Sequence, residues 1–257
     1  MGMVLAVASG KGGVGKTTLT ANLALSLCAL GKTVIAVDGD MGMRSLDFSL
    51  GLQDKAVYDL ADVCEGRVAP EQALVSFARQ PKLRFLAASH TEGWAHINPT
   101  AFEQTVEQLR ALADVVILDC PAGVGKGFLC AAAAAERILV VATHDPSSVR
   151  DAGRVAQLLD GLGKTDNRLV LNRYDPAPVK KGRVPVMDEL IDRISLQLIA
   201  VIPLDDRLAL GTLSGLPAVL DKRCKAAAAY RNLAKRILGK RVPLGRVFVN
   251  GKARHIL

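Results

Sequence analysis

The segment GKGGVGKTT at residues 10–18 constrains the fold of this 257-residue chain more than any other stretch. It fits the pattern G-x-x-x-x-G-K-[ST] of a phosphate-binding loop. The apolar run Met3–Ala8 before it predicts a buried strand, and helically spaced leucines after it predict a helix over 17–30. In this order of strand, loop and helix, backbone N–H groups and the helix N-terminus bind a phosphate.

The side chains of the loop have separate expected tasks. Lys16 is placed to reach the β and γ oxygens of a nucleotide, and Thr17 to supply a hydroxyl to Mg²⁺. An ordinary phosphate loop needs one lysine, so the second one, Lys11, requires its own explanation. We expect the nucleotide to be bound by the whole loop, which comprises Gly10, Lys11, Gly12, Gly13, Val14, Gly15, Lys16, Thr17 and Thr18.

Apolar runs recur along the rest of the chain and predict its fold class. Most are separated by helix-length segments such as Pro99–Leu112 and Ser147–Leu162, and a last helix is expected over Arg223–Leu238. This alternation predicts an α/β fold with a doubly wound, mostly parallel sheet and helices on both faces. No linker divides the chain, so we expect one P-loop domain over 1–243 and a tail over 244–257. The predicted strands are TVIAVD, LRFLAA, DVVILDC, RILVVAT, NRLVLN and LIAVIP.

Carboxylates follow two of these strands. Asp119 ends the run VVIL, where it would lie beside the phosphate loop and hold Mg²⁺ through water. Asp38 and Asp40 follow TVIAV, on a loop that can order around a γ-phosphate, and either could support the metal shell or orient the attacking water. Capping or solvated turn residues are the alternative for each carboxylate taken singly.

Composition excludes several classes of protein. Half of the residues are hydrophobic, which argues against a disordered or fibrous chain. Five cysteines without C-x-x-C spacing argue against a disulfide framework and favour a reducing cytosol. No apolar run approaches the roughly 20 residues that span a bilayer, and the N-terminus does not fit a signal peptide.

The net charge of +8 is concentrated toward the C-terminus. From Lys222 onward the chain carries many lysines and arginines, and the nearest acidic residue is Asp221. Such a surface attracts nucleic-acid backbones or anionic lipid headgroups, although a merely solvated basic face explains it equally well.

The motifs together resemble the deviant Walker A ATPases, the ParA and MinD group, and Lys11 carries that resemblance. In this family the extra lysine contacts the nucleotide of the partner subunit, so that two protomers enclose two ATP molecules. The resemblance implies an ATP-dependent homodimer with ATP and Mg²⁺ as cofactors and an ATPase that is slow until a partner stimulates it. Catalytic roles would fall to Lys11, Lys16 and Asp40, and metal binding to Thr17, Asp38 and Asp119.

Further segments are similar to the MinD branch rather than to the chromosome-partitioning ParA branch. By this resemblance Asn172 and Arg173 frame the adenine together with Pro203 and Asp205. The chemistry is suitable, because an amide pairs with a purine edge and a guanidinium stacks on it. The segments are MGMRSLDFSLGL, AVYDLADVCEG, DCPAG, SSVRDAGRV, LNRYDP, LIAVIPLDD, GLPAVLD and AYRNLAKRILGKRVPL.

The MinD branch implies a protein that is cytoplasmic and peripheral on the inner face of the cell membrane, where it positions the division septum. Its implied partners are a MinC-like division inhibitor, a MinE-like or other topological regulator, and the anionic inner membrane surface. Three alternatives stay open: a flagellar-number regulator of the same family, a ParA-like partition ATPase that binds DNA, and a scaffold that binds nucleotide without hydrolysing it. Nucleic-acid binding is less favoured than membrane binding, although the net charge of +8 would suit it.

The sequence departs from the family pattern at three places. Ser45 stands where an asparagine is usual, and Gly125 with Lys126 follows PAGV where an acidic residue is typical. Family members usually end in an amphipathic helix that inserts into the membrane. Here Gly245 and Gly251 interrupt the tail, each at a cost of about 1 kcal/mol to a helix, and RVFVN predicts a strand. The tail's apolar and basic residues are Leu244, Val247, Phe248, Val249, Ile256 and Leu257, with Arg246, Lys252 and Arg254.

Other candidates are weaker. Cys120 and Cys130 suit small buried positions better than a shared metal cluster, and the four histidines show no metal-ligand spacing. Trp94 in the SHTEGW segment either touches a partner or covers the sheet, and we favour the second interpretation.

Overall fold

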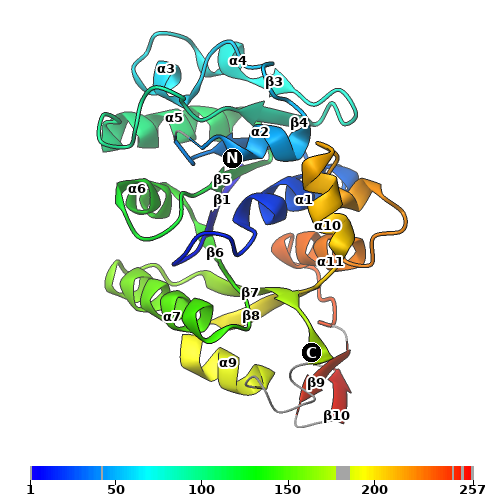
Figure 1. The fold of residues 1–257 in the computed structure, drawn as a ribbon. Helices are drawn as coiled ribbons and strands as arrows, with labels where there is room; N and C mark the ends of the chain where they lie inside the picture. Colours follow the sequence, from blue (N-terminus) through cyan, green and yellow to red (C-terminus); the bar gives the residue numbers. More distant parts are fainter. Residues whose placement is uncertain (1, 42, 178–185, 245, 250–251, 256–257) are drawn as a thin grey trace.

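The computed structural model describes residues 2–41, 43–177, 186–244, 246–249 and 252–255. It contains an eight-stranded sheet in the order β3-β4-β2-β5-β1-β6-β7-β8 (Figure 1). All neighbouring strands run parallel except β3, which pairs antiparallel with β4 at the edge. The strands are β1 (Met3–Ala8), β2 (Val34–Asp38), β3 (Val75–Ser76), β4 (Leu83–Leu86), β5 (Val115–Asp119), β6 (Arg137–Ala142), β7 (Asn167–Tyr174) and β8 (Gln197–Pro203).

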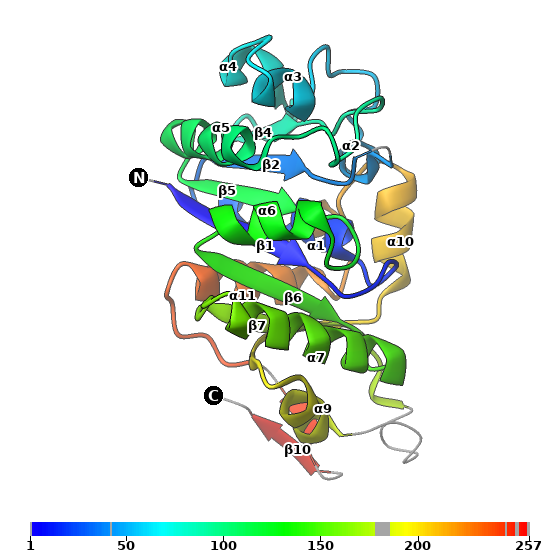
Figure 2. The ribbon, with the colours of Figure 1, turned by 90° about the vertical axis from the view of Figure 1, so that its left-hand side faces the viewer.

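Helices cover both faces of this sheet (Figures 1 and 2). One face carries α5 (Pro99–Leu112), α6 (Lys126–Ala134), α7 (Pro146–Gly161) and α9 (Met187–Ile194). The other carries α1 (Lys16–Ala29) and α11 (Ala227–Ile237), with α2 (Ser45–Leu50) and α10 (Asp206–Leu213) near the carboxyl ends of the strands. Three short helical segments complete the fold: α3 (Leu60–Cys64), α4 (Pro70–Ala73) and the 3-10 turn η1 (Ala218–Leu220).

Strand β1 is apolar throughout because both of its faces are buried. Val4, Ala6 and Ala8 belong to the core on the α5–α7 side, whereas Leu5 and Val7 belong to the core around α1. Successive side chains of a strand point to opposite faces, so a central strand between two helix layers needs apolar residues at every position. The predicted doubly wound, mostly parallel α/β fold is therefore confirmed.

Several boundaries differ from the sequence-based expectation, most of them by one or two residues. The last helix begins at Ala227 rather than Arg223, because the N–H groups of Lys225 and Ala226 donate to the carboxylate of Asp205 and hold the segment before the helix. The predicted strand LRFLAA ends at Leu86, although Ala87 and Ala88 are also buried. The periodicity of apolar residues predicts that these elements occur but not the residues at which they begin and end.

The described residues of the tail form two strands. In Figure 1, β9 (Arg246–Val249) and β10 (Lys252–His255) form an antiparallel pair, which confirms the strand predicted at RVFVN over 246–249. The predicted helix-breaking residues Gly245 and Gly251 and the apolar residues Ile256 and Leu257 lie outside the described residues. No helix in the described part of the chain has the length and apolarity needed to cross a membrane.

Candidate nucleotide-binding site

The predicted functional residues converge at the carboxyl ends of the central strands. In the sheet register, Asp38 of β2 lies opposite Asp119 of β5, and Asp119 lies opposite Val7 of β1. The phosphate loop starts three residues after Val7, at Gly10. Parallel pairing therefore brings the loop and both carboxylates to one edge, which is where ligands bind in doubly wound sheets.

The loop has the backbone conformation that its glycines permit. Gly13 and Gly15 have φ values of 78° and 94°, in the left-handed region. A Cβ atom on Gly10 would lie 2.6 Å from the carbonyl oxygen of Asp151. Gly15 precedes α1, and among the described residues no side chain caps the N-terminus of that helix. Its first N–H groups are thus available to an anion.

The two lysines of the loop have different surroundings. Lys16 is 8% exposed, and its Nζ donates to the hydroxyl of Ser9 at 3.0 Å. Lys11 is more exposed and turns toward the start of α7, where its Nζ lies 2.9 Å from Oδ1 of Asp145 and 2.8 Å from Oγ of Ser147. Lys16 therefore lies inside the loop, whereas Lys11 lies at its outer side and contacts a different element of the same subunit.

Asp145 is well prepared to hold Lys11. Partial burial raises the pKa of its carboxyl, but hydrogen bonds from Thr143, Lys11 and Ser147 outweigh burial and lower that pKa well below its usual range. Asp145 also caps α7 by accepting from the N–H of Ser148 at 3.0 Å. The carboxylate is therefore charged at neutral pH and fixed in orientation.

Asp38 and Asp119 are fully buried. Burial raises the pKa of both carboxyls, and the nearby Asp119 charge raises the pKa of Asp38 further. Asp38 accepts N–H groups from Asp40 at 2.9 Å and Leu46 at 3.0 Å, so it organises the loop that carries Asp40. Two buried carboxyls on adjacent strand ends repel each other when both are charged. Protonation of one carboxyl or a cation bound beside them removes this repulsion.

The residues present fit a magnesium ion bound with a nucleotide. Oδ1 of Asp119 accepts from Thr20 at 3.1 Å, whereas its Oδ2 is buried and has no hydrogen-bond partner within the described ranges. The hydroxyl of Thr17 lies 3.0 Å from that of Ser45. No group of three or more His, Cys, Asp or Glu that could hold a metal occurs in the described part of the chain. The buried Oδ2 of Asp119 and the hydroxyl of Thr17 suit Mg²⁺, which is usually bound by one or two protein oxygens, phosphates and water.

Asp40 lies close to Lys16 at the mouth of the loop. Partial burial raises the pKa of its carboxyl, and the charge of Lys16 opposes that rise. The carbonyl of Asp40 accepts the N–H groups of Met43 and Arg44, and Arg44 forms a buried ion pair with Asp47 at 3.3 Å. These contacts hold the backbone of Asp40, and the charge of Lys16 acts on its carboxyl.

A pocket of about 510 Å³ adjoins the loop on the α10 side. The amide nitrogen of Asn172 donates to the carbonyl of Val14 at 2.8 Å. This contact fixes the amide orientation, and Oδ1 of Asn172 is left buried without a hydrogen-bond partner among the described residues. Arg173 has a φ of 52°, a strained conformation of the kind that collects at binding sites. The pocket is lined by Gly15, Thr18, Asn172, Arg173, Leu204, Asp205, Asp206, Leu208, Ala209, Thr212 and Leu213.

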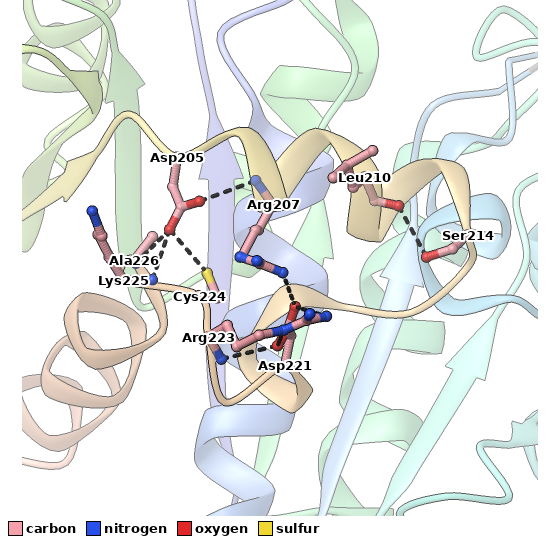
Figure 3. Close-up of polar contacts among 9 residues, drawn as sticks. All are labelled: Asp205, Arg207, Leu210, Ser214, Asp221, Arg223, Cys224, Lys225 and Ala226. Atoms are coloured by element: carbon pink, nitrogen blue, oxygen red, sulfur yellow. Dashed lines mark hydrogen bonds and ion pairs between the residues drawn. The ribbon is translucent and has the colours of Figure 1, made fainter.

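The other two residues expected to frame the adenine, Pro203 and Asp205, differ in their position relative to this pocket. Pro203 ends β8 opposite Tyr174 and is not one of the residues that line the pocket. Asp205 lines it, but its carboxylate is engaged by the backbone, as Figure 3 shows. Oδ1 accepts from the N–H of Arg207 at 3.0 Å, and Oδ2 accepts from the N–H groups of Lys225 and Ala226 at 2.7 and 3.2 Å.

Several site residues escaped the sequence analysis. Ser9 and Thr20 bond the phosphate lysine and Asp119, and Asp145 with Ser147 holds Lys11. A signal existed for the last pair, because the polar run HDPSS directly follows strand RILVVAT, and β6 is a neighbour of β1. That adjacency requires the strand order, which the sequence alone does not give.

The fold and the site define a P-loop nucleotide-binding protein with a second lysine in the loop. A family model for the CobQ/CobB/MinD/ParA nucleotide binding domain matches residues 5–218. The septum site-determining protein MinD of Thermotoga maritima is 41% identical over 251 residues, which cover 97% of this chain and 93% of that protein. The chain belongs to the MinD family within this group of nucleotide-binding domains.

Solved structures agree with this assignment. The MinC:MinD cell division protein complex of Aquifex aeolicus contains a chain with 39% sequence identity and a TM-score of 0.89, covering 95% of this chain and 98% of that one. The septum site-determining protein MinD of Pyrococcus horikoshii, complexed with Mg-ADP, is 31% identical with a TM-score of 0.81 and covers 92% and 96% of the two chains.

Proposed function

We propose that this protein is a Mg²⁺-dependent ATPase that dimerises with ATP and positions the cell-division septum. The observation that carries the proposal is the pair of lysines in one loop, of which Lys16 lies inside and Lys11 lies at the outer side. Relatives at up to 41% identity over nearly the whole chain bear the name septum site-determining protein. The fold, the unpartnered Asp119 and Asn172 oxygens and these names support the same function.

The chain's own residues supply most of the chemistry. The N–H groups of the loop and of the first turn of α1 bind the phosphates, and Lys16 moves from Ser9 to the γ-phosphate. Thr17 and Asp119 hold Mg²⁺, with Asp38 organising the adjacent loop. When bound, the metal neutralises charge that develops on the phosphates. Asp40 orients the attacking water, and Oδ1 of Asn172 accepts a hydrogen bond from the adenine amino group.

Lys11 links hydrolysis to assembly in this proposal. In the single subunit it is paired with Asp145 and Ser147. In the dimer it leaves this pair and contacts the nucleotide of the other subunit, so each site is completed by its partner. An exposed ion pair contributes only about 0–1 kcal/mol, which a phosphate contact readily exceeds.

The dimer would then recruit its partners. A MinC-like division inhibitor is supported by the MinC:MinD complex of Aquifex aeolicus, while a MinE-like regulator and the anionic inner membrane surface follow from the family. The tail over 244–257 is the proposed membrane-contacting segment. Two weakly binding tails on one dimer act together and multiply their affinities.

Sedimentation with liposomes and with DNA tests this function against the partition alternative. The protein is mixed with Mg-ATP and either anionic liposomes or non-specific DNA, and the chain shortened to 1–243 is the control. We expect ATP-dependent pelleting with liposomes that the shortened chain loses. Salt-sensitive pelleting with DNA and none with liposomes would instead favour a ParA-like function.

A further inference from the structure

The segment 89–97, here called the strap, connects β4 to α5 and reaches the loop that carries Asp40. The indole Nε1 of Trp94 donates to the carbonyl of Gly39 at 2.7 Å. The N–H of Ser89 donates to Sδ of Met41 at 3.3 Å. These contacts fall on the residues immediately before and after Asp40. The strap therefore contacts the backbone of the residue before Asp40, the proposed water-positioning residue, and the side chain of the residue after it.

The strap also contacts the start of α6, which follows the loop after Asp119. A Cβ atom on Gly127 would lie 2.5 Å from Cε2 and Nε1 of Trp94, so the indole lies directly against the Gly127 backbone. Nζ of Lys126 donates to the carbonyl of Ala95 at 3.0 Å. Trp94 and Lys126, the lysine after PAGV that departs from the family pattern, thus meet in one cluster.

The indole of Trp94 packs on α5 and lies beside a hydrogen bond that joins the end of β2 to the end of β5. Its ring packs edge to face on Phe102 of α5, with centroids 5.2 Å apart and planes at 70°. Next to it, the N–H of Gly39 donates to the carbonyl of Asp119 at 2.9 Å. A side chain that only covered the sheet would need apolar contacts alone. Here the polar atom of the ring is bonded to the backbone next to Asp40.

We propose that Trp94 is a positioning residue that holds the Asp40 loop against the loop after Asp119, with Lys126 as the second fastening of the strap. The inference rests on the proposed ATPase function, because it gives Asp40 a fixed place relative to the metal and phosphate residues. Trp94 acts through the carbonyl of Gly39 and does not itself touch the substrate. This assigns a task to the segment for which the sequence analysis favoured simple coverage.

Hydrogen–deuterium exchange in the nucleotide-free protein tests the contact directly. Trp94→Phe keeps a ring against Phe102 but removes the donor to Gly39. We expect amide exchange over residues 39–46 to become about fivefold faster, the effect of losing one ordinary hydrogen bond. Exchange in β7 should not change, because that strand does not contact the strap. Equal exchange over 39–46 in the variant and the parent protein would overturn the proposal.

Steady-state kinetics separate positioning from structural support. We expect Trp94→Phe to lower kcat about fivefold while KM for ATP stays within about twofold. Lys126→Met should likewise lower kcat and leave KM for ATP within about twofold of the parent value. Lys82→Met is the matched control, because Lys82 also donates to a backbone carbonyl, that of Gly31 at 2.9 Å, but at the opposite end of the sheet. The control should leave kcat unchanged.

The outcomes distinguish this inference from the proposed function. If the parent protein binds and hydrolyses ATP but both strap variants keep its kcat, the positioning role is wrong and the ATPase function stands. If the parent protein does not turn over ATP, the proposed function fails, and exchange over 39–46 still decides whether the strap holds the loop. Should Trp94→Phe unfold, Lys126→Met carries the same exchange and kinetic test, and unchanged values there overturn the proposal.

Discussion

At the scale of single residues, Gly15 shows how closely two distant parts of the chain are fitted. Its φ is 94°, and a Cβ there would lie 2.5 Å from Nδ2 of Asn172. Gly15→Ala should therefore strain the backbone and push away the amide that bonds Val14. We expect the free energy of unfolding in urea to fall by about 2–4 kcal/mol and nucleotide affinity by at least roughly tenfold.

Gly31→Ala is the matched control for this prediction. Gly31 has nearly the same φ, 92°, but a Cβ there meets nothing within 4 Å. Its cost should be the backbone strain alone, about 1–2 kcal/mol, with unchanged nucleotide binding. Equal losses of stability and affinity in the two variants would show that the Asn172 contact contributes nothing.

The sequence predicted the residues of the site better than their contacts. The loop, Asp38, Asp40 and Asp119 were found because glycine loops and strand-end carboxylates are local patterns. The pairing of Lys11 with Asp145 joins positions 134 residues apart. It follows from β6 lying beside β1, and no local pattern specifies which strands become neighbours.

At the scale of elements, Asp205 joins the end of β8, the start of α10 and the approach to α11 (Figure 3). Partial burial raises the pKa of its carboxyl, but N–H groups of Arg207, Ala226 and Lys225 outweigh burial and lower that pKa. Backbone N–H groups donate to both carboxylate oxygens of Asp205, whereas the side chain in Asp205→Asn has only one acceptor oxygen. We expect the free energy of unfolding at pH 7 to fall by about 1–2 kcal/mol.

The pH dependence of this loss has a defined sign. Because the pKa of Asp205 is lower in the folded than in the unfolded protein, its stabilisation is complete above the unfolded pKa of about 4. It disappears as the pH falls through the lower folded pKa. Unfolding titrations from pH 7 to pH 3 should show the parent and Asp205→Asn converging. The exposed neighbour Asp206→Asn is the control, and a constant difference for Asp205→Asn at all pH values would contradict the account.

The same cluster explains why one helix boundary could not be predicted. Periodicity favoured a helix from Arg223, but Arg207 binds Asp221 at 2.8 Å and Asp205 takes the N–H groups of Lys225 and Ala226. These groups come from another element and hold the segment before Ala226, so that the helix begins only at Ala227. Local sequence predicts which helices and strands occur along the chain, whereas the residue at which this helix begins depends on tertiary hydrogen bonds.

At the scale of the whole molecule, the doubly wound sheet gathers the loop, the carboxylates and the pocket that Asn172 lines at one edge, with Lys11 at the outer side of the loop. Trp94 and Lys126 join the strap to Gly39 and to the start of α6. Under the proposed function, each nucleotide site lacks only Lys11 of the partner subunit. Nucleotide binding and dimerisation should therefore be separable by mutation.

The molar mass of the protein by light scattering, with Mg²⁺ and a non-hydrolysable ATP analogue, tests this claim most directly. The parent protein should double its mass from 27.2 kDa when the analogue is added. Lys11→Ala should stay at the monomer mass while it binds a fluorescent nucleotide with affinity within roughly tenfold of the parent. A Lys11→Ala protein that doubles its mass like the parent, or a parent that stays monomeric when saturated with nucleotide, would contradict the account.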